Sequence, residues 1–165
     1  FGFADDEVVL LFASSSHARK GLPLIETVVR HTPLPVVIAV AGRPPERTSE
    51  RIRYLGYLED LEDGYRAADF TILASKYEPF GLVAIESAMC GTPAIVAGNI
   101  GCCDAIAPEQ RFVFAPDDAA DLHAVLERAT RVARTGPQRA WTAGGRAALA
   151  YDPDVAAHVD VTDVE

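Results

Sequence analysis

Short apolar runs alternate with helical patterns along most of this chain, and this alternation restricts the possible folds more than any other feature. Four runs are of the continuous type found in strands covered on both faces, at residues 8–13, 36–40, 70–74 and 94–97. Shorter strands are predicted at 52–55 and 112–114. Apolar residues at helical spacing separate them at 22–30, 61–68 and 82–89. Because parallel neighbours need crossover connections, this order predicts an α/β fold with a doubly wound parallel sheet.

The length of 165 residues suits one domain, which we place at residues 1–151. After residue 117 the pattern becomes helical, and we expect helices at 121–134 and 138–150, with Trp141 in the helical core. Residues 152–165 are expected to form a loosely ordered C-terminal tail. The chain begins at Phe1 without an initiator methionine, so we expect it to be an excised part of a longer protein.

The charge and cysteine content exclude several classes of function. The 24 acidic residues exceed the 15 basic ones, and the resulting formal charge of −9 repels nucleic acid, so no nucleic-acid partner is expected. The three cysteines form neither an even secreted framework nor a CxxC metal pair. We therefore expect a cytoplasmic protein without a metal site.

The segment after the first apolar run is a candidate anion-binding loop. In a doubly wound sheet, ligands bind beyond the carboxyl ends of the strands, where loops lead into helix N-termini. Residues 14–21 are small, polar and basic, and Lys20 in this segment can supply a positive charge. The alternative is a solvated loop whose serines cap the following helix.

The segment EPFGLVAIE, residues 78–86, is the second candidate. A helix that begins near Phe80 would leave four N–H groups without intrahelical partners, those of Phe80, Gly81, Leu82 and Val83. Gly81 has no Cβ that would keep a phosphate away from the backbone. Glu78 and Glu86 would then bracket a phosphate-sized site. The alternative is that Glu78 caps the helix and Glu86 lies on the surface.

Helical spacing also predicts which face of this helix packs on the sheet. Leu82, Ile85 and Met89 recur at intervals of three and four residues, and we expect them to point toward the sheet.

The segment 78–86, together with AMCGTPAIV at 88–96, resembles the E-x7-E signature and following turn of retaining GT-B glycosyltransferases of the family 4 type. Supporting segments occur in the expected order at 19–21, 41–42, 54–57 and 67–69, and the resemblance covers residues 7–151. It implies a Rossmann-like domain that forms the C-terminal half of a GT-B fold. This half binds the nucleotide-sugar donor, and the N-terminal acceptor domain would be missing from this chain.

The resemblance also implies roles for individual residues. Glu86 would accept hydrogen bonds from the ribose hydroxyls, and the amides of residues 80–83 would hold the diphosphate. Glu78 would contact the donor sugar and Lys20 would neutralise the diphosphate, which makes these two the candidate catalytic residues. The segment around Tyr54 would lie against the nucleobase. No cofactor or metal is expected, since a lysine and helix amides can stabilise the leaving group.

Two positions depart from the family pattern. Ser14 stands where many members carry an arginine that binds the diphosphate with the lysine, and serine supplies no charge. Cys102 replaces the second of two glycines in the loop 99–104, which approaches the donor sugar in the family.

Three functions follow as hypotheses. The first is the donor domain of a retaining glycosyltransferase that transfers a sugar to a glycan or lipid-linked acceptor, in the cytoplasm or at the inner face of the membrane. The isolated domain would be inactive because one wall of its cleft is missing. The second is a non-catalytic nucleotide-sugar binding subunit that works with a separate acceptor domain. The third is a sugar-nucleotide epimerase of the same architecture.

Overall fold

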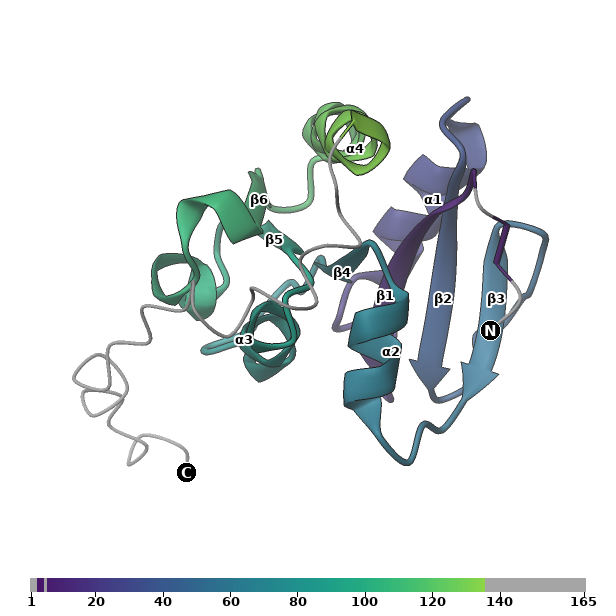
Figure 1. Cartoon of the computed structure of the whole chain (residues 1–165), viewed down its shortest axis with the longest axis horizontal. Helices are drawn as coiled ribbons and strands as arrows, with labels where there is room; N and C mark the ends of the chain where they lie inside the picture. Colours follow the sequence, from purple (N-terminus) through teal and green to yellow (C-terminus); the bar gives the residue numbers. More distant parts are fainter. Residues whose placement is uncertain (1–2, 5, 136–165) are drawn as a thin grey trace.

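A parallel sheet forms the centre of the protein, whose computed structural model describes residues 3–4 and 6–135 (Figure 1). In this part of the chain the sheet has six strands in the order β3-β2-β1-β4-β5-β6. The strands are β1 (Val8–Ser14), β2 (Val36–Gly42), β3 (Ile52–Gly56), β4 (Phe70–Leu73), β5 (Ala94–Ala97) and β6 (Arg111–Phe114). All neighbours pair in parallel, which confirms the predicted doubly wound sheet.

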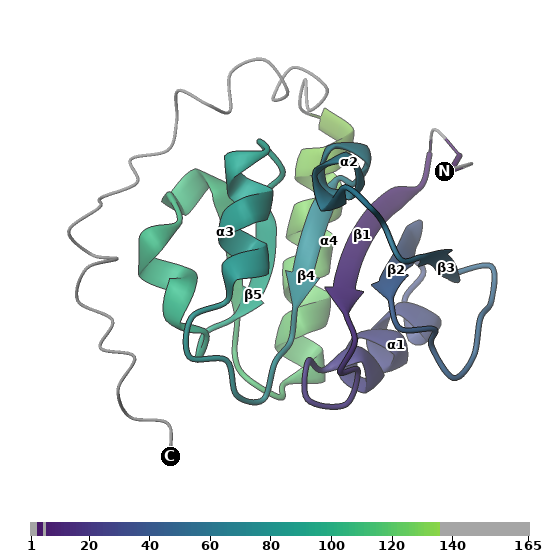
Figure 2. The same cartoon turned by 90° about the horizontal axis from the view of Figure 1, so that it is seen from below.

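Helices cover both faces of the sheet. The helices α1 (Leu22–His31) and α4 (Ala119–Thr135) pack together on one face, and α2 (Leu61–Ala67) and α3 (Leu82–Met89) pack together on the other (Figures 1 and 2). Two short 3-10 helices, η1 (Gly101–Ala105) and η2 (Pro108–Gln110), were not predicted. None of the helices in the described region is long and apolar enough to cross a membrane. The predicted helix 138–150 with Trp141, the domain boundary at 151 and the tail 152–165 lie outside the described residues.

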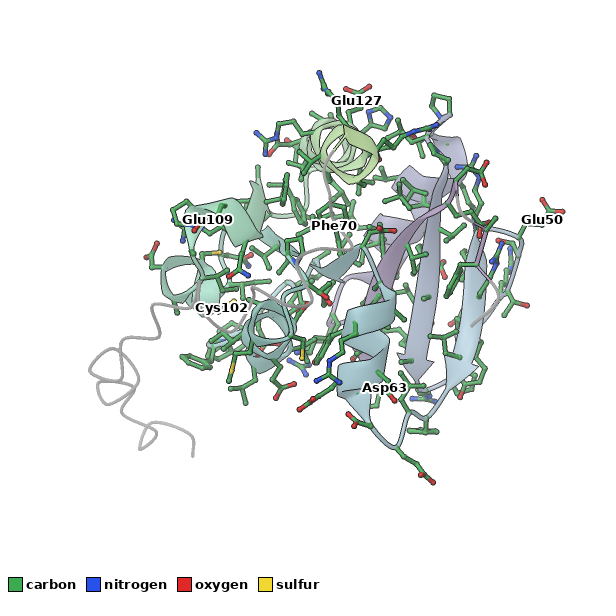
Figure 3. All side chains as sticks on the ribbon, in the orientation of Figure 1. Glu50, Asp63, Phe70, Cys102, Glu109 and Glu127 are labelled. Carbon is green, nitrogen blue, oxygen red and sulfur yellow. The ribbon has the colours of Figure 1, made fainter. Side chains whose placement is uncertain are left out.

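The continuous apolar runs reflect burial on both sides of the sheet. In β1, Leu10 and Phe12 belong to the core beneath α1 and α4, whereas Val9 and Leu11 belong to the core beneath α2. Phe70 of β4 is fully buried between these layers (Figure 3). Side chains alternate between the two faces of a strand, so only a strand covered on both faces is apolar at every position.

The predicted packing face of α3 is wrong for Leu82 and Met89, whereas Ile85 is partly buried against the core as predicted. Leu82 and Met89 are 60% and 52% exposed, and the side chains that face the sheet are those of Ala84, Ser87 and Ala88. Small residues let α3 approach the sheet closely. The Ser87 hydroxyl is satisfied in this position, because it bonds to Thr71 Oγ1 at 2.7 Å. Helical spacing alone favoured the large apolar residues, but close packing selected the small ones.

The chain changes direction between β1 and β4, which are neighbours in the sheet. After β1 the chain turns to α1 on one face, and after β4 it turns to α3 on the other. Such a switch point opens a crevice at the carboxyl ends of the two strands. The two loops touch there: a Cβ on Gly21, which has φ +79°, would lie 2.0 Å from the Ala74 carbonyl oxygen.

Candidate functional site

Hydrogen bonds to backbone carbonyls hold three loops together at the carboxyl edge of the sheet. The amide of Lys76, after β4, donates to the Arg19 carbonyl after β1 at 3.1 Å. The side chain of Asn99, after β5, donates to the Lys76 carbonyl at 3.0 Å. The amide of Gly101 donates to the Glu78 carbonyl at 3.3 Å. The loops that carry the predicted site residues are therefore fixed relative to one another.

The structure brings Lys20 and Glu78 into direct contact. The ammonium of Lys20 donates to Glu78 Oε2, and the two side chains are only 17% and 13% exposed. Arg19 Nη1 lies 3.8 Å from the same carboxylate oxygen, although its own side chain is 52% exposed. Two cations therefore lie at the switch point around one carboxylate, which leaves one positive charge in excess for an anionic ligand.

The N-terminus of α3 differs from the prediction in the role of its glycine. The helix begins at Leu82, the first residue of the predicted stretch 82–89 and two residues after Phe80, with Gly81 as its N-cap at φ 87°. A Cβ on Gly81 would lie 2.7 Å from Ile100 Cγ2 and 3.0 Å from Cys102 Sγ. Gly81 is thus required by its left-handed backbone and by packing against η1, not by the approach of a ligand. The amides of the first helical turn remain suited to an anion.

Glu86 is held by a residue that the sequence analysis did not identify. The hydroxyl of Tyr65 in α2 donates to Glu86 Oε2 at 2.9 Å. Burial, and next the hydrogen bond to Glu86, raise the pKa of the Tyr65 phenol far above its ordinary value. The only sequence signal for Tyr65 was an apolar position in the helix 61–68, which carries no information about Glu86.

Ser14 and Tyr54 both make local hydrogen bonds at the ends of their strands. Ser14 Oγ accepts from the Ser16 amide at 2.9 Å, so it helps to form the turn after β1. The Tyr54 hydroxyl donates to the Gly42 carbonyl at 2.8 Å, and its ring is 38% exposed. Tyr54 therefore links the carboxyl ends of β2 and β3, where a planar group could lie against it.

A cavity of about 350 Å³ lies at the same edge, between the loops after β1 and β2. Its lining consists of Ser15, Ser16, His17, Ala18, Arg43, Pro44 and Glu46. Four of these residues belong to the candidate anion-binding loop 14–21, whereas Lys20 and the other individually predicted site residues do not line the cavity.

Comparison with known proteins identifies the family. The profile of the family described as "Glycosyl transferases group 1" matches residues 1–135. The chain belongs to the group 1 glycosyl transferases. The predicted glycosyltransferase assignment is thereby confirmed at the level of group 1, and the predicted Rossmann-like domain of GT-B type is confirmed with it.

Relatives of this group 1 domain agree with the assignment. It is 69% identical over 147 residues to a probable transglycosylase of Burkholderia thailandensis, covering 88% of this chain and 40% of that protein. Sucrose-phosphate synthase from Thermosynechococcus elongatus has a similar structure, with 27% identity and a TM-score of 0.69 over 86% of this chain and 40% of that one. A structure of Anabaena HepE in complex with UDP-glucose shares the fold, with 18% identity and a TM-score of 0.71 over 92% of this chain and 46% of that one. The domain thus spans less than half the length of these proteins.

Cys102, the second of the two positions that depart from the family pattern, is buried in this group 1 domain. Its side chain is fully inaccessible in η1, beside Gly81 (Figure 3). Burial raises the pKa of the thiol to about 12. Cys102 is therefore a packing residue under the α3 N-terminus rather than a ligand for metal. Among the described residues there is no group of three or more His, Cys, Asp or Glu side chains that could hold a metal ion.

We expect alkaline pH to destabilise the domain partly through Cys102. An unfolded thiol loses its proton near pH 9, whereas the folded thiol keeps it to about pH 12. The contribution of Cys102 to the free energy of unfolding is therefore constant below pH 9. It falls as the pH rises from 9 toward 12, by at most about 1.4 kcal/mol per pH unit. Denaturant titrations between these pH values should show a smaller decline for Cys102→Ala than for wild type. Cys90→Ala removes a half-buried thiol whose pKa burial raises by a smaller amount, so it should change the decline less than Cys102→Ala does. Identical slopes for wild type and Cys102→Ala would contradict the assignment.

Proposed function

We propose that this group 1 domain is the donor half of a retaining glycosyltransferase, which transfers a sugar from a nucleotide diphosphate sugar to a glycan or lipid-linked acceptor. The observation that carries the proposal is the Lys20–Glu78 pair at the switch point of the sheet, fixed beside the first turn of α3. Anabaena HepE, which shares the fold, has been solved with UDP-glucose, and the Burkholderia relative is named a probable transglycosylase. Both names are compatible with donor binding and sugar transfer.

In the proposed mechanism, Lys20 and the amides at the start of α3 bind the diphosphate. As the glycosidic bond to the diphosphate breaks, negative charge grows on the leaving phosphate oxygen. A fixed ammonium and a helix N-terminus stabilise this charge without the need for a metal ion. Glu78, already oriented by Lys20, accepts hydrogen bonds from hydroxyls of the donor sugar. Arg19 supplies a second positive charge at the same place.

The remaining candidate residues bind the nucleoside. Glu86 accepts hydrogen bonds from the ribose hydroxyls, and the segment around Tyr54 lies against the base. The acceptor site and the retention of anomeric configuration are parts of the proposal that rest on the resemblance of residues 78–86 and on the longer relatives. An NMR assignment of the product anomer, made with a protein that contains both halves, tests the stereochemistry.

The two glutamates should respond differently to ligands. Glu86→Gln is expected to weaken binding of a bare nucleoside diphosphate by about 1 kcal/mol or more, because an amide is a poorer acceptor for ribose hydroxyls than a carboxylate. Glu78→Gln should leave that binding nearly unchanged and impair recognition of the sugar. Calorimetric titrations with UDP, GDP and ADP, and with the matching sugar nucleotide, measure both effects. Equal losses for the two variants with the sugar-free ligand would refute this division of roles.

Ser14 favours a second candidate function, that of a non-catalytic nucleotide-sugar binding subunit. This position lacks the charge of an arginine, and its hydroxyl is already used within the turn. A subunit that only binds the donor needs less stabilisation of the leaving group than an enzyme does. The coding sequence before Phe1 separates the two candidates: a further α/β domain in the same reading frame supports the enzyme, and its absence supports the subunit.

A further inference from the structure

Tyr65 is a fully buried residue whose hydroxyl reaches the edge of the candidate site. The side chain is only 1% exposed and packs under α2 against β1 and β2. Its hydroxyl donates to Glu86 Oε2 at 2.9 Å. Glu86, in contrast, is an exposed residue of α3. The hydrogen bond therefore joins a rigid core side chain to a surface carboxylate that would otherwise sample several rotamers.

Further hydrogen bonds fix Tyr65 relative to α3. The Tyr65 carbonyl accepts from Thr92 Oγ1 at 2.6 Å. Thr92 in turn is joined to Ser87, the residue after Glu86: the Thr92 amide donates to the Ser87 carbonyl at 2.9 Å, and Ser87 Oγ donates to the Thr92 carbonyl at 2.8 Å. The backbone of α2 at Tyr65 and that of α3 at Glu86 are thus connected through the turn after α3.

The hydrogen bond to Tyr65 leaves one oxygen of the Glu86 carboxylate available to a ligand. A carboxylate has two acceptor oxygens, and Tyr65 contacts Oε2. The phenol stays neutral well beyond physiological pH, because burial and the neighbouring carboxylate raise its pKa. It therefore remains a hydrogen-bond donor to Oε2, and Oε1 of Glu86 can accept from hydroxyl groups of a ligand.

We propose that Tyr65 is a positioning residue, which holds Glu86 in the orientation that binds the two ribose hydroxyls of the donor nucleotide. The inference rests on the proposed function, in which Glu86 binds the ribose. Tyr65 itself does not touch the ligand. The alternative is that the hydrogen bond to Glu86 only satisfies the buried hydroxyl of Tyr65. Removal of the hydroxyl would then affect stability and not ligand selectivity.

Tyr65→Phe tests the inference in the 165-residue chain, since it keeps the buried ring and removes only the hydroxyl. Binding of UDP, GDP and ADP is measured by calorimetry, each beside its 2′,3′-dideoxy analogue, which lacks both ribose hydroxyls. The Kd of the ribonucleotide should rise about fivefold to tenfold, whereas that of the dideoxy analogue should not change. In a Glu86→Ala background, Tyr65→Phe should have no further effect on either ligand.

Tyr77→Phe is the matched control, because it removes the hydroxyl of an exposed tyrosine. Thermal unfolding of each variant separates stability from binding. If Tyr65→Phe does not fold, Glu86→Asp replaces it, because the shorter carboxylate withdraws from the Tyr65 hydroxyl; it should show the same selective loss for ribonucleotides.

The outcomes separate this inference from the function on which it depends. If wild type binds a ribonucleoside diphosphate and Tyr65→Phe binds it equally well, or loses the same factor for the dideoxy analogue, the positioning role is refuted while donor binding stands. If wild type binds none of the three ribonucleoside diphosphates, the proposed function fails and the inference fails with it.

Discussion

Lys20→Ala should weaken the binding of a nucleoside diphosphate by about 1–3 kcal/mol, which corresponds to roughly a tenfold to hundredfold rise in Kd. Lys20 is nearly buried at the switch point and is held against Glu78. Its removal takes away a charge-assisted contact to the diphosphate. It also leaves the Glu78 carboxylate facing the phosphates, with Arg19 at 3.8 Å as the remaining cation of this cluster. Both changes oppose binding, and calorimetry measures their sum.

The chain offers a matched control in its other lysine, Lys76, which is exposed in the neighbouring loop. Lys76→Ala removes one positive charge from the protein but leaves the Lys20–Glu78 pair intact. Its effect on diphosphate affinity should therefore be small and should disappear in high salt. The double variant Lys20→Ala with Glu78→Gln should recover part of the lost affinity, because it also removes the unpaired carboxylate. Diphosphate binding by Lys20→Ala at the wild-type level would remove the main physical support for the proposed donor site.

Gly21→Ala should lower the free energy of unfolding by about 3–5 kcal/mol, a large part of the stability of a domain this size. Gly21 has φ +79°, where a residue with a Cβ is strained, and the new Cβ would lie 2.0 Å from the Ala74 carbonyl oxygen. That atom belongs to the backbone at the end of β4, so it cannot swing away as the tip of a side chain could. The loop after β1 would have to separate from the loop after β4. Denaturant titration measures the loss.

Gly56→Ala separates the effect of backbone strain from the effect of the close contact that Gly21→Ala also introduces. Gly56 has a similar φ of +85°, but no heavy atom lies within 4 Å of the position of its Cβ. This variant should therefore lose only the backbone contribution, about 1–2 kcal/mol. Equal losses at the two positions would show that the close contact between Gly21 and Ala74 does not contribute to stability.

Local patterns in the sequence were sufficient to predict the six strands and the four α-helices of the described residues, but not the two 3-10 helices. The strands β1, β2 and β5 are continuous apolar runs, and each of the six predicted strands was found within one or two residues of its expected bounds. The start of α2 at residue 61 was also predicted. There the side chain of Asp60 caps the helix by accepting from the Glu62 amide at 2.9 Å. Such signals involve residues a few positions apart, and they act before any tertiary contact forms.

The placement of Lys20 and Glu78 at one edge of the sheet was also predictable, because parallel strands present their carboxyl ends together. The ion pair between them was not, since 58 positions separate the two residues along the chain. Their contact requires that β1 and β4 be neighbours. The alternation of runs predicts a parallel sheet but does not specify the order of its strands.

The tertiary structure alone decided three features of the site. It turned Leu82 and Met89 outward, because the small side chains of α3 allow closer packing on the sheet. It determined why residue 81 is a glycine, because the side chains of Ile100 and Cys102 fill the space that a Cβ would need. It brought the hydroxyl of Tyr65 to Glu86. Each feature depends on contacts between elements that crossover connections separate, and helical spacing or a motif of nine residues contains no information about such neighbours. The sequence by itself determined which segments form the sheet and its helices, whereas only the packing of those segments determined how the site residues are held.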